Sequence, residues 1–160
     1  MIAPGERIPS AVFKVKTDTA TNEVTSDAYF AGARVVVFGL PGAFTPTCSR
    51  NHLPGYLEHL GALKAKGIDK VAVVSVNDHH VMHAWAKATG GEGKIDYLAD
   101  GSARFVTALG LADDRSNEGM GVRSKRWAMV VDDGIVKTLN VEDAGGKVTN
   151  SGAEAILATL

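Results

Sequence analysis

Hydrophobic and polar positions change their spacing along the chain in a way that predicts alternating strands and helices. Residues 11–16 alternate apolar and polar side chains, which is typical of a strand with one exposed face. Residues 34–40 and 71–76 are nearly continuous apolar runs, as expected for strands in a sheet that is covered on both faces. A shorter strand is predicted over residues 96–99. Together these segments predict the middle of one sheet.

A hairpin is predicted near the end of the chain. Residues 127–131 and 135–141 are apolar segments that flank Asp133-Gly134. A two-residue hairpin turn needs positive φ, which Asp and Gly tolerate. The hairpin is antiparallel, whereas the early strand-helix-strand unit is parallel. The order of elements therefore predicts an α/β fold with a mixed central β-sheet flanked by helices.

Two longer helices are predicted between these strands. Residues 48–66 carry leucines on one helical stripe, although Pro54 should kink the helix there. Residues 79–89 form the second helix, which Asn77 or Asp78 caps.

Two shorter helices follow. Residues 103–109 are expected to form a helix that ends at Gly110. Ser151 is followed three positions later by Glu154, which matches a capping box and predicts a last helix over residues 151–160.

Composition limits the classes of function. The chain has 160 residues, which suits a single domain over 1–160, and its formal net charge of -1 points to neither nucleic acid nor an anionic membrane as a partner. The start, MIAPGERIPS, lacks the features of a signal peptide, and the longest apolar run is too short to span a bilayer. We therefore expect a soluble cytoplasmic protein, or a lumenal one without its targeting segment.

Cys48 is the only cysteine of the chain. One thiol excludes an internal disulfide and a cysteine-rich metal site. Without context, such a residue is most often a small buried hydrophobic side chain. Any thiol chemistry of this chain must therefore use Cys48.

The residues around Cys48, GLPGAFTPTCSR over positions 39–50, favour a reactive thiol. Pro46 suits the first turn of a helix and Thr45 is a good N-cap, so Cys48 should open a helix directly after a buried strand. Free N–H groups and the positive end of the helix dipole stabilise a thiolate there. Ligands also usually bind at the carboxyl ends of strands in such folds. Cys48 is thus a candidate nucleophile, although Thr45 and Pro41 taken alone suit a cap and a turn.

Histidines near and beyond Cys48 have simpler interpretations. His52 lies four residues after Cys48 on the same helical face, where it either packs or assists proton transfer. His79 and His83 have the spacing of paired metal ligands, but no acidic or thiol partner is evident, so an exposed face is favoured and no metal site is expected. The GGEG of residues 90–93 is a loop rather than a phosphate cradle.

The segment PGAFTPTC resembles the active-site pattern of peroxiredoxins, which places proline, threonine and cysteine at Pro41, Thr45 and Cys48. The flanking CSRNHLPGY, the SVND of residues 75–78 and RSKRWAMVVDDGIVKTLNVE of residues 123–142 are similar to the type-5 (plant type II) peroxiredoxins. The similarity covers essentially the whole chain. It implies a thioredoxin-like fold and a thiol-dependent peroxidase without a cofactor.

The resemblance also implies roles for individual residues. Cys48 would be the peroxidatic nucleophile that becomes a sulfenic acid, Thr45 would orient the peroxide, and Pro41 would shield the sulfur from water. Arg126 matches the active-site arginine of the family and would stabilise the thiolate and the developing charge on oxygen. Backbone N–H groups of Thr47 and Cys48 would add to this substrate site.

The chain departs from the family where a second cysteine is often found. Thr149 to Ser151 and Val73-Val74 stand at those places, so an external thiol must resolve the sulfenic acid. The resemblance favours glutathione with glutaredoxin as reductant, with thioredoxin second. It also implies a homodimer, to which loops after Phe44, Val76 and Leu111 would contribute.

Two other functions fit part of the pattern. A thiol-disulfide exchanger would need a CxxC motif, which the chain lacks. A peroxide sensor that passes oxidation to a partner protein would use the same residues for its first step, so the sequence leaves this alternative open.

Overall fold

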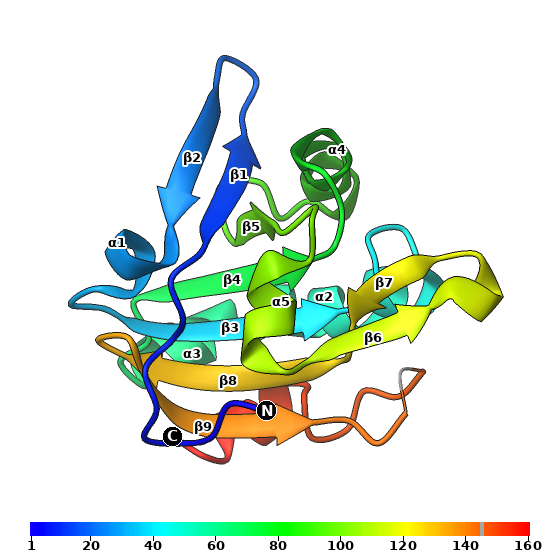
Figure 1. Cartoon of the computed structure of the whole chain (residues 1–160). Coiled ribbons are helices and arrows are strands. Elements are labelled where there is room, and N and C mark those ends of the chain that lie inside the picture. The colour runs from blue at the N-terminus through cyan, green and yellow to red at the C-terminus, as the bar shows by residue number, and fades with distance from the viewer. Residues whose placement is uncertain (145) are drawn as a thin grey trace.

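The computed structural model describes residues 1–144 and 146–160. A seven-stranded mixed sheet with the order β2-β1-β5-β4-β3-β8-β9 forms its centre (Figure 1). A separate two-stranded sheet pairs β6 with β7. The strands are β1 (Val12–Lys16), β2 (Thr21–Thr25), β3 (Arg34–Leu40), β4 (Lys70–Ser75), β5 (Asp96–Ala99), β6 (Ala112–Arg115), β7 (Gly121–Ser124), β8 (Trp127–Asp132) and β9 (Ile135–Val141).

Strand directions confirm the mixed sheet. The neighbours β3, β4 and β5 run parallel, while β8 pairs antiparallel with both β3 and β9. Asp133 and Gly134 join β8 to β9 with φ values of 47° and 78°, the positive range that the hairpin turn requires. Because β3 and β8 are antiparallel, the end of β3 lies beside the start of β8.

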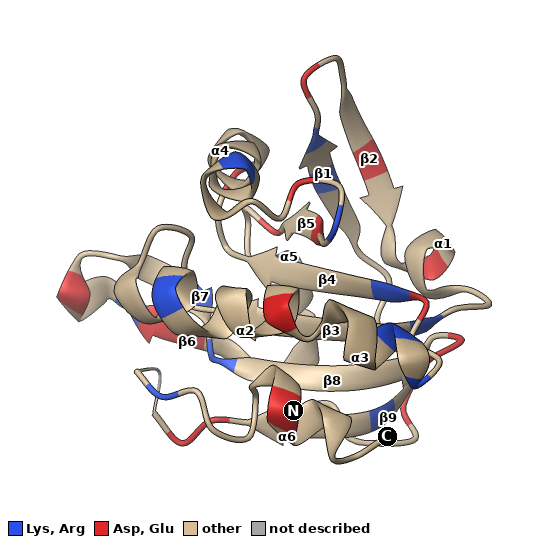
Figure 2. Cartoon of the chain, turned by 180° about the vertical axis from the view of Figure 1, so that it is seen from behind, with Lys and Arg blue, Asp and Glu red and all other residues tan. Residues whose placement is uncertain are grey.

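Helices cover both faces of the sheet. They are α1 (Ser26–Phe30), α2 (Leu53–Glu58), α3 (Leu60–Ala65), α4 (His79–Thr89), α5 (Arg104–Leu109) and α6 (Ala153–Leu157), with a π-helical turn over Cys48–His52, here called the π turn, and a 3-10 turn over Ser116–Glu118. Buried residues of α2, α3, α4 and α6 form one core, and those of α1 and α5 form the other. Figure 2 shows α2, α3 and α6 across the face that is turned away in Figure 1.

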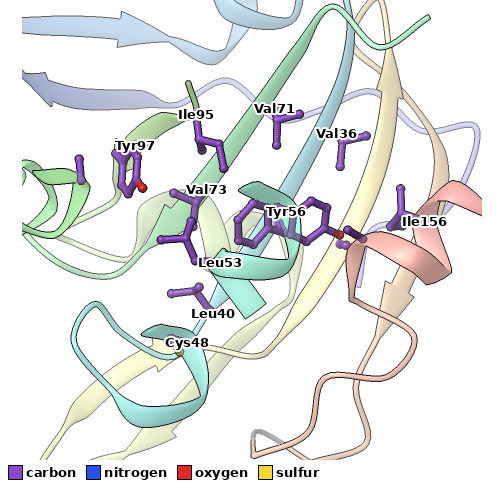
Figure 3. Packing of buried hydrophobic residues seen from close by; sticks show 14 of the residues in the cluster. Val36, Leu40, Cys48, Leu53, Tyr56, Val71, Val73, Ile95, Tyr97 and Ile156 are labelled. Atoms are coloured by element: carbon purple, nitrogen blue, oxygen red, sulfur yellow. The ribbon is translucent and has the colours of Figure 1, made fainter. Parts of the chain in front are cut away.

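Strand β3 supplies both cores because successive side chains point to opposite faces. Val36, Phe38 and Leu40 belong to the core under α2 and α4, which Figure 3 shows around Tyr56. Val35 and Val37 belong to the core under α5. This double burial explains the continuous apolar run in the sequence.

The single helix predicted over residues 48–66 is wrong in detail, because the segment forms the π turn, α2 and α3. In an α-helix the ring of Pro54 would clash with the carbonyl four residues earlier. The π turn precedes it and closes with a hydrogen bond from Leu53 N–H to Cys48 O. The break between α2 and α3 falls at His59, whose ring Nδ1 and backbone N–H both lie at hydrogen-bond distance from the Gly55 carbonyl, at 2.8 Å and 3.2 Å.

The predicted helix caps have mixed outcomes. Asp78 caps α4 as expected, since its carboxylate accepts from Val81 N–H at 2.9 Å. The capping box at Ser151 is wrong: α6 begins at Ala153 with Gly152 as its N-cap, and the Ser151 hydroxyl donates to Glu142 instead. The Ser151 side chain therefore bonds the Glu142 carboxylate and does not cap the helix.

Elements with little hydrophobic pattern were not predicted. Strand β2 reads TNEVT and is mostly exposed, and α1, β6 and β7 are similarly short or polar. None of the helices in the described part of the chain is long and apolar enough to cross a membrane.

Candidate functional site

Cys48 lies where the chain enters the π turn, after the loop that follows β3. Helical geometry begins at Pro46, and the first helical hydrogen bond runs from Ser49 N–H to Thr45 O at 3.0 Å. The N–H groups of Thr47 and Cys48 precede that bond, so the helix does not use them. The thiol is completely buried against the core that contains Leu40 and Leu53 (Figure 3).

Arg126 brings a positive charge to the buried thiol. Its Nη2 donates to Cys48 Sγ at 3.1 Å, and its Nη1 donates to His52 Nδ1 at 2.9 Å. Only 2% of the arginine is exposed. A guanidinium is always protonated and carries several fixed donors, so one side chain can hold both groups at once. The pair of contacts therefore fixes the cation beside the sulfur.

The register of β3 and β8 positions Arg126. Gly39 pairs with Trp127, the residue that follows Arg126. The indole of Trp127 lies over Gly39 so closely that a Cβ at this position would be 2.3 Å from the ring. The indole N–H also donates to Ser124 Oγ at 2.9 Å. Because Gly39 has no side chain, the Trp127 indole can pack against β3, and this packing directs the neighbouring Arg126 to the site.

His52 accepts the second hydrogen bond that the Arg126 guanidinium donates. Because Arg126 can only donate, His52 Nδ1 is the acceptor, and the proton lies on Nε2, which donates to Ser151 O at 3.0 Å. Burial, followed by the charge of Arg126, lowers the pKa of His52 to about 3. The imidazole is therefore neutral at physiological pH and acts as a fixed acceptor.

Glu142 organises the backbone behind His52. Its carboxylate accepts from the N–H and hydroxyl of Thr149 and from the N–H and hydroxyl of Ser151. Burial raises the pKa of Glu142, but these hydrogen bonds outweigh it and lower the pKa below its usual value. The backbone N–H of Glu142 also donates to Arg126 O at 2.9 Å. Glu142 thus supports Ser151, whose carbonyl accepts from His52, through its carboxylate, and the backbone of Arg126 through its N–H.

The loop before Cys48 is held by residues of other segments. Asn77 Oδ1, which follows β4, accepts from Ala43 N–H at 2.9 Å. Arg123 Nη1 donates to the Pro41 carbonyl at 3.4 Å. The Thr45 hydroxyl donates to Gly42 O at 2.7 Å, so it does not cap the helix as its spacing predicts.

The structure joins part of the predicted site by direct contacts. Cys48, Arg126 and His52 form one hydrogen-bonded chain. Pro41, Thr45 and Thr47 lie on the segment that leads to Cys48, where Pro41 is buried and the other two are half-buried. Their roles stay predictions.

Several supporting residues were missed in the sequence. Glu142, Ser151 and Asn77 act through tertiary hydrogen bonds, and Arg123 contacts the Pro41 carbonyl. The only signal was indirect, since Asn77 and Glu142 lie within two of the stretches that resemble the family, residues 75–78 and 123–142.

Comparisons with known proteins agree with this geometry. Residues 3–157 match the family model described as Redoxin. The chain is 46% identical to "Peroxiredoxin-2E-2, chloroplastic" of Oryza sativa subsp. japonica, over 99% of the chain and 72% of that protein. It is 43% identical to "Peroxiredoxin-2B" of Arabidopsis thaliana, over 99% of the chain and 98% of that protein.

A solved structure gives the same result. The chain resembles the structure of reduced Prx3 in complex with H₂O₂ from Vibrio vulnificus, with 48% identity, a TM-score of 0.94 and 99% of each chain covered. This likeness confirms the thioredoxin-like fold. The chain belongs to the Redoxin family and is a peroxiredoxin of the type-5 (plant type II) group with a single cysteine, that is, a thiol-dependent peroxidase.

Proposed function

We propose that this peroxidase reduces hydrogen peroxide and organic hydroperoxides at Cys48, and that an external thiol completes the cycle. The Cys48 thiolate attacks the terminal oxygen of the hydroperoxide. The S–O bond forms as the O–O bond breaks, so the sulfur is oxidised to a sulfenic acid, and the departing oxygen takes a proton to leave as water or an alcohol. The observation that carries this proposal is the 3.1 Å contact from Arg126 Nη2 to the buried Sγ.

Arg126 serves both ends of this reaction in the proposal. Its guanidinium stabilises the thiolate before attack and the negative charge that develops on the leaving oxygen. A fixed donor in a buried site needs little reorganisation when that charge appears. The contact with His52 keeps the guanidinium from turning away from the sulfur.

Thr45 and Pro41 take supporting roles in the proposal. The Thr45 proton is engaged by Gly42 O, which leaves the hydroxyl oxygen ready to accept a hydrogen bond from the peroxide O–H. Buried Pro41 adds no N–H and screens the sulfur from water. The N–H groups of Thr47 and Cys48, which the helix does not use, complete the substrate site.

The reductant is proposed to be glutathione with glutaredoxin, with thioredoxin as the second candidate. Support comes from the single cysteine, since a sulfenic acid at Cys48 has no second thiol of the same chain to attack it. The related plant proteins suggest the same class of reaction but do not identify the donor.

A homodimer is proposed to form through the face beside Cys48. Phe44 is 56% exposed and has a φ of 62°, which is unusual for a large side chain, and Val122 of β7 is 45% exposed. Contiguous exposed apolar surface often marks contacts between proteins, and these two side chains would contribute to such a surface. Burying Phe44 against a second copy would offset the strain of its backbone.

Steady-state peroxide consumption tests the proposal. Wild-type protein should turn over repeatedly with glutathione and glutaredoxin, and Cys48→Ser should consume no peroxide. A single burst of one peroxide per chain, with every reductant, would support the sensor instead. Intact mass after graded peroxide should show the addition of one, two or three oxygen atoms. A disulfide-linked dimer as the working intermediate would overturn external resolution.

A further inference from the structure

Asp18, His83 and Glu92 meet on the opposite side of α4 from the thiol chemistry described above. Asp18 lies in the turn between β1 and β2, His83 in α4, and Glu92 in the loop that follows α4. Figure 1 shows the β1–β2 hairpin standing beside α4. The sequence pairs His83 with His79 by spacing, but the structure instead places beside His83 the carboxylate of distant Asp18 and that of Glu92 in the adjoining loop.

The distances suit ligands of one ion. His83 Nε2 lies 3.4 Å from Asp18 Oδ1 and 3.7 Å from Glu92 Oε1, and all three ligand atoms lie within 4.8 Å of one another. Ligands bonded at about 2.1 Å to a tetrahedral ion are about 3.4 Å apart. Only small movements would therefore bring the three atoms around a common centre.

The nitrogen of His83 provides an independent reason to expect a ligand. Nε2 is buried and has no hydrogen-bond partner among the residues that the structure describes, while 11% of the side chain is exposed. Buried polar atoms are nearly always satisfied, so an unsatisfied one needs an explanation. This atom faces the two carboxylates at ion-pair distance but forms a hydrogen bond with neither of them.

We propose that Asp18, His83 and Glu92 bind a divalent transition-metal ion of the zinc class. Imidazole nitrogen and carboxylate oxygen together suit Zn²⁺, whereas Ca²⁺ and Mg²⁺ prefer oxygen ligands alone. Three protein ligands leave a position for water. The site shares no residue with the Cys48 cluster, so it is independent of the proposed function.

Lys87 competes with the ion for Asp18. Its Nζ forms an ion pair with Asp18 Oδ1, and this hydrogen bond lowers the pKa of Asp18 below its usual value. The pair is exposed, with 50% of the Lys87 and 63% of the Asp18 side chain accessible. Exposed ion pairs contribute little, so a bound ion replaces Lys87 at small cost.

An ion at this site would join the hairpin tip to α4 and to the loop after it. The hairpin tip, which is far from α4 in the sequence, would then share one centre with α4 and its following loop. Because the ion binds the folded chain and not the unfolded one, it raises the midpoint of thermal unfolding.

Titration of untagged Cys48→Ser protein with Zn²⁺ tests the site, because this background removes the thiol as a ligand. Calorimetry should show one saturable ion per chain at pH 7.5. Glu92→Gln and Asp18→Asn, which alter exposed carboxylates, should each weaken binding at least tenfold, and His83→Asn should weaken it further. His80→Asn, an exposed histidine of the same helix, is the matched control and should bind normally.

Thermal unfolding gives a second readout. Zn²⁺ should raise the midpoint, chelator should reverse the rise, and the rise should be lost in Glu92→Gln. Absence of saturable binding overturns the proposal. Equal binding by the three site variants also overturns it, because the ion would then lie elsewhere.

Discussion

Arg126 Nη2 lies 3.1 Å from Cys48 Sγ although the two residues are 78 positions apart in the sequence. The same guanidinium donates to His52, so the cation at the thiol is held on a second side. The contact links the start of β8 to the π turn. Charge and position at the sulfur therefore depend on the whole sheet and not on the twelve residues around the cysteine.

Replacing Arg126 with lysine should keep the positive charge but lose the pair of hydrogen bonds to Cys48 and His52. Lysine presents one ammonium, which cannot hold Sγ and His52 together. We expect kcat/KM for peroxide to fall about 100-fold, similar to the loss of one oxyanion donor. Stopped-flow peroxide reduction measures the rate. Arg50→Lys, an exposed position of the π turn, serves as the control. An unchanged rate in Arg126→Lys would show that the mechanism does not need both hydrogen bonds of the guanidinium.

His52 should make stability depend on pH between about 3 and 6.5, the pKa values of the folded and unfolded states. The folded state keeps the imidazole neutral, while the unfolded state takes up a proton below 6.5. The contribution is therefore complete above pH 6.5 and is lost as pH falls toward 3, with a slope of at most about 1.4 kcal/mol per pH unit.

The comparison between pH 7 and pH 5 isolates this contribution. His52→Asn cannot titrate and should lose much less stability over that interval in urea unfolding. His80→Asn, which changes an exposed histidine, should behave as the wild type does. Equal pH slopes in wild type and His52→Asn would mean that His52 is not buried in its neutral form.

Glu142→Gln should destabilise the protein at pH 7 by about 1–3 kcal/mol, because it replaces a charged acceptor of several hydrogen bonds and introduces an amide that faces donors. The lowered pKa of Glu142 means that its contribution is present above about pH 4.5 and lost as pH falls through the lower folded value. The gap between wild type and variant should therefore shrink in acid. Chemical unfolding at pH 7 and pH 3.5 measures it, with exposed Glu154→Gln as the control. A constant gap would contradict this explanation.

Gly39→Ala should destabilise the fold and slow catalysis together. The added Cβ would lie 2.3 Å from the Trp127 ring, and overpacking of this kind typically costs about 1–3 kcal/mol. Trp127 would have to move, and Arg126 beside it would lose its alignment with Cys48. Gly61→Ala, where a Cβ meets nothing within 4 Å, is the control. A stable variant with normal peroxide reduction would disprove the coupling between this packing and the site.

Much of the sheet was predictable from the sequence, because apolar runs such as β3 and β4 reflect burial on both faces. Cys48 was predictable too, since a strand, a proline and a helix start are local features. Arg126 was identified by resemblance alone, because only the β3–β8 register brings it to the thiol.

Predictions for Ser151 and His83 fail for the same reason: each side chain contacts residues outside its own predicted helix, and the local sequence does not show such contacts. Ser151 has the spacing of a cap but bonds Glu142. His83 finds its carboxylates on segments outside its own helix. The single domain over 1–160 and the cytoplasmic location stay predictions.

The complete burial of Cys48 sets different demands on the two substrates of the enzyme. A hydroperoxide is small enough to approach a recessed sulfur, but a protein thiol must bring two sulfur atoms into contact. With a protein thiol as reductant, as proposed above, we therefore expect the π turn, whose backbone closes with the hydrogen bond from Leu53 N–H to Cys48 O, to open during every cycle. We then expect the recycling rate to level off at high reductant concentration, because the opening of this turn, and not the supply of thiol, would limit how fast Cys48 is regenerated.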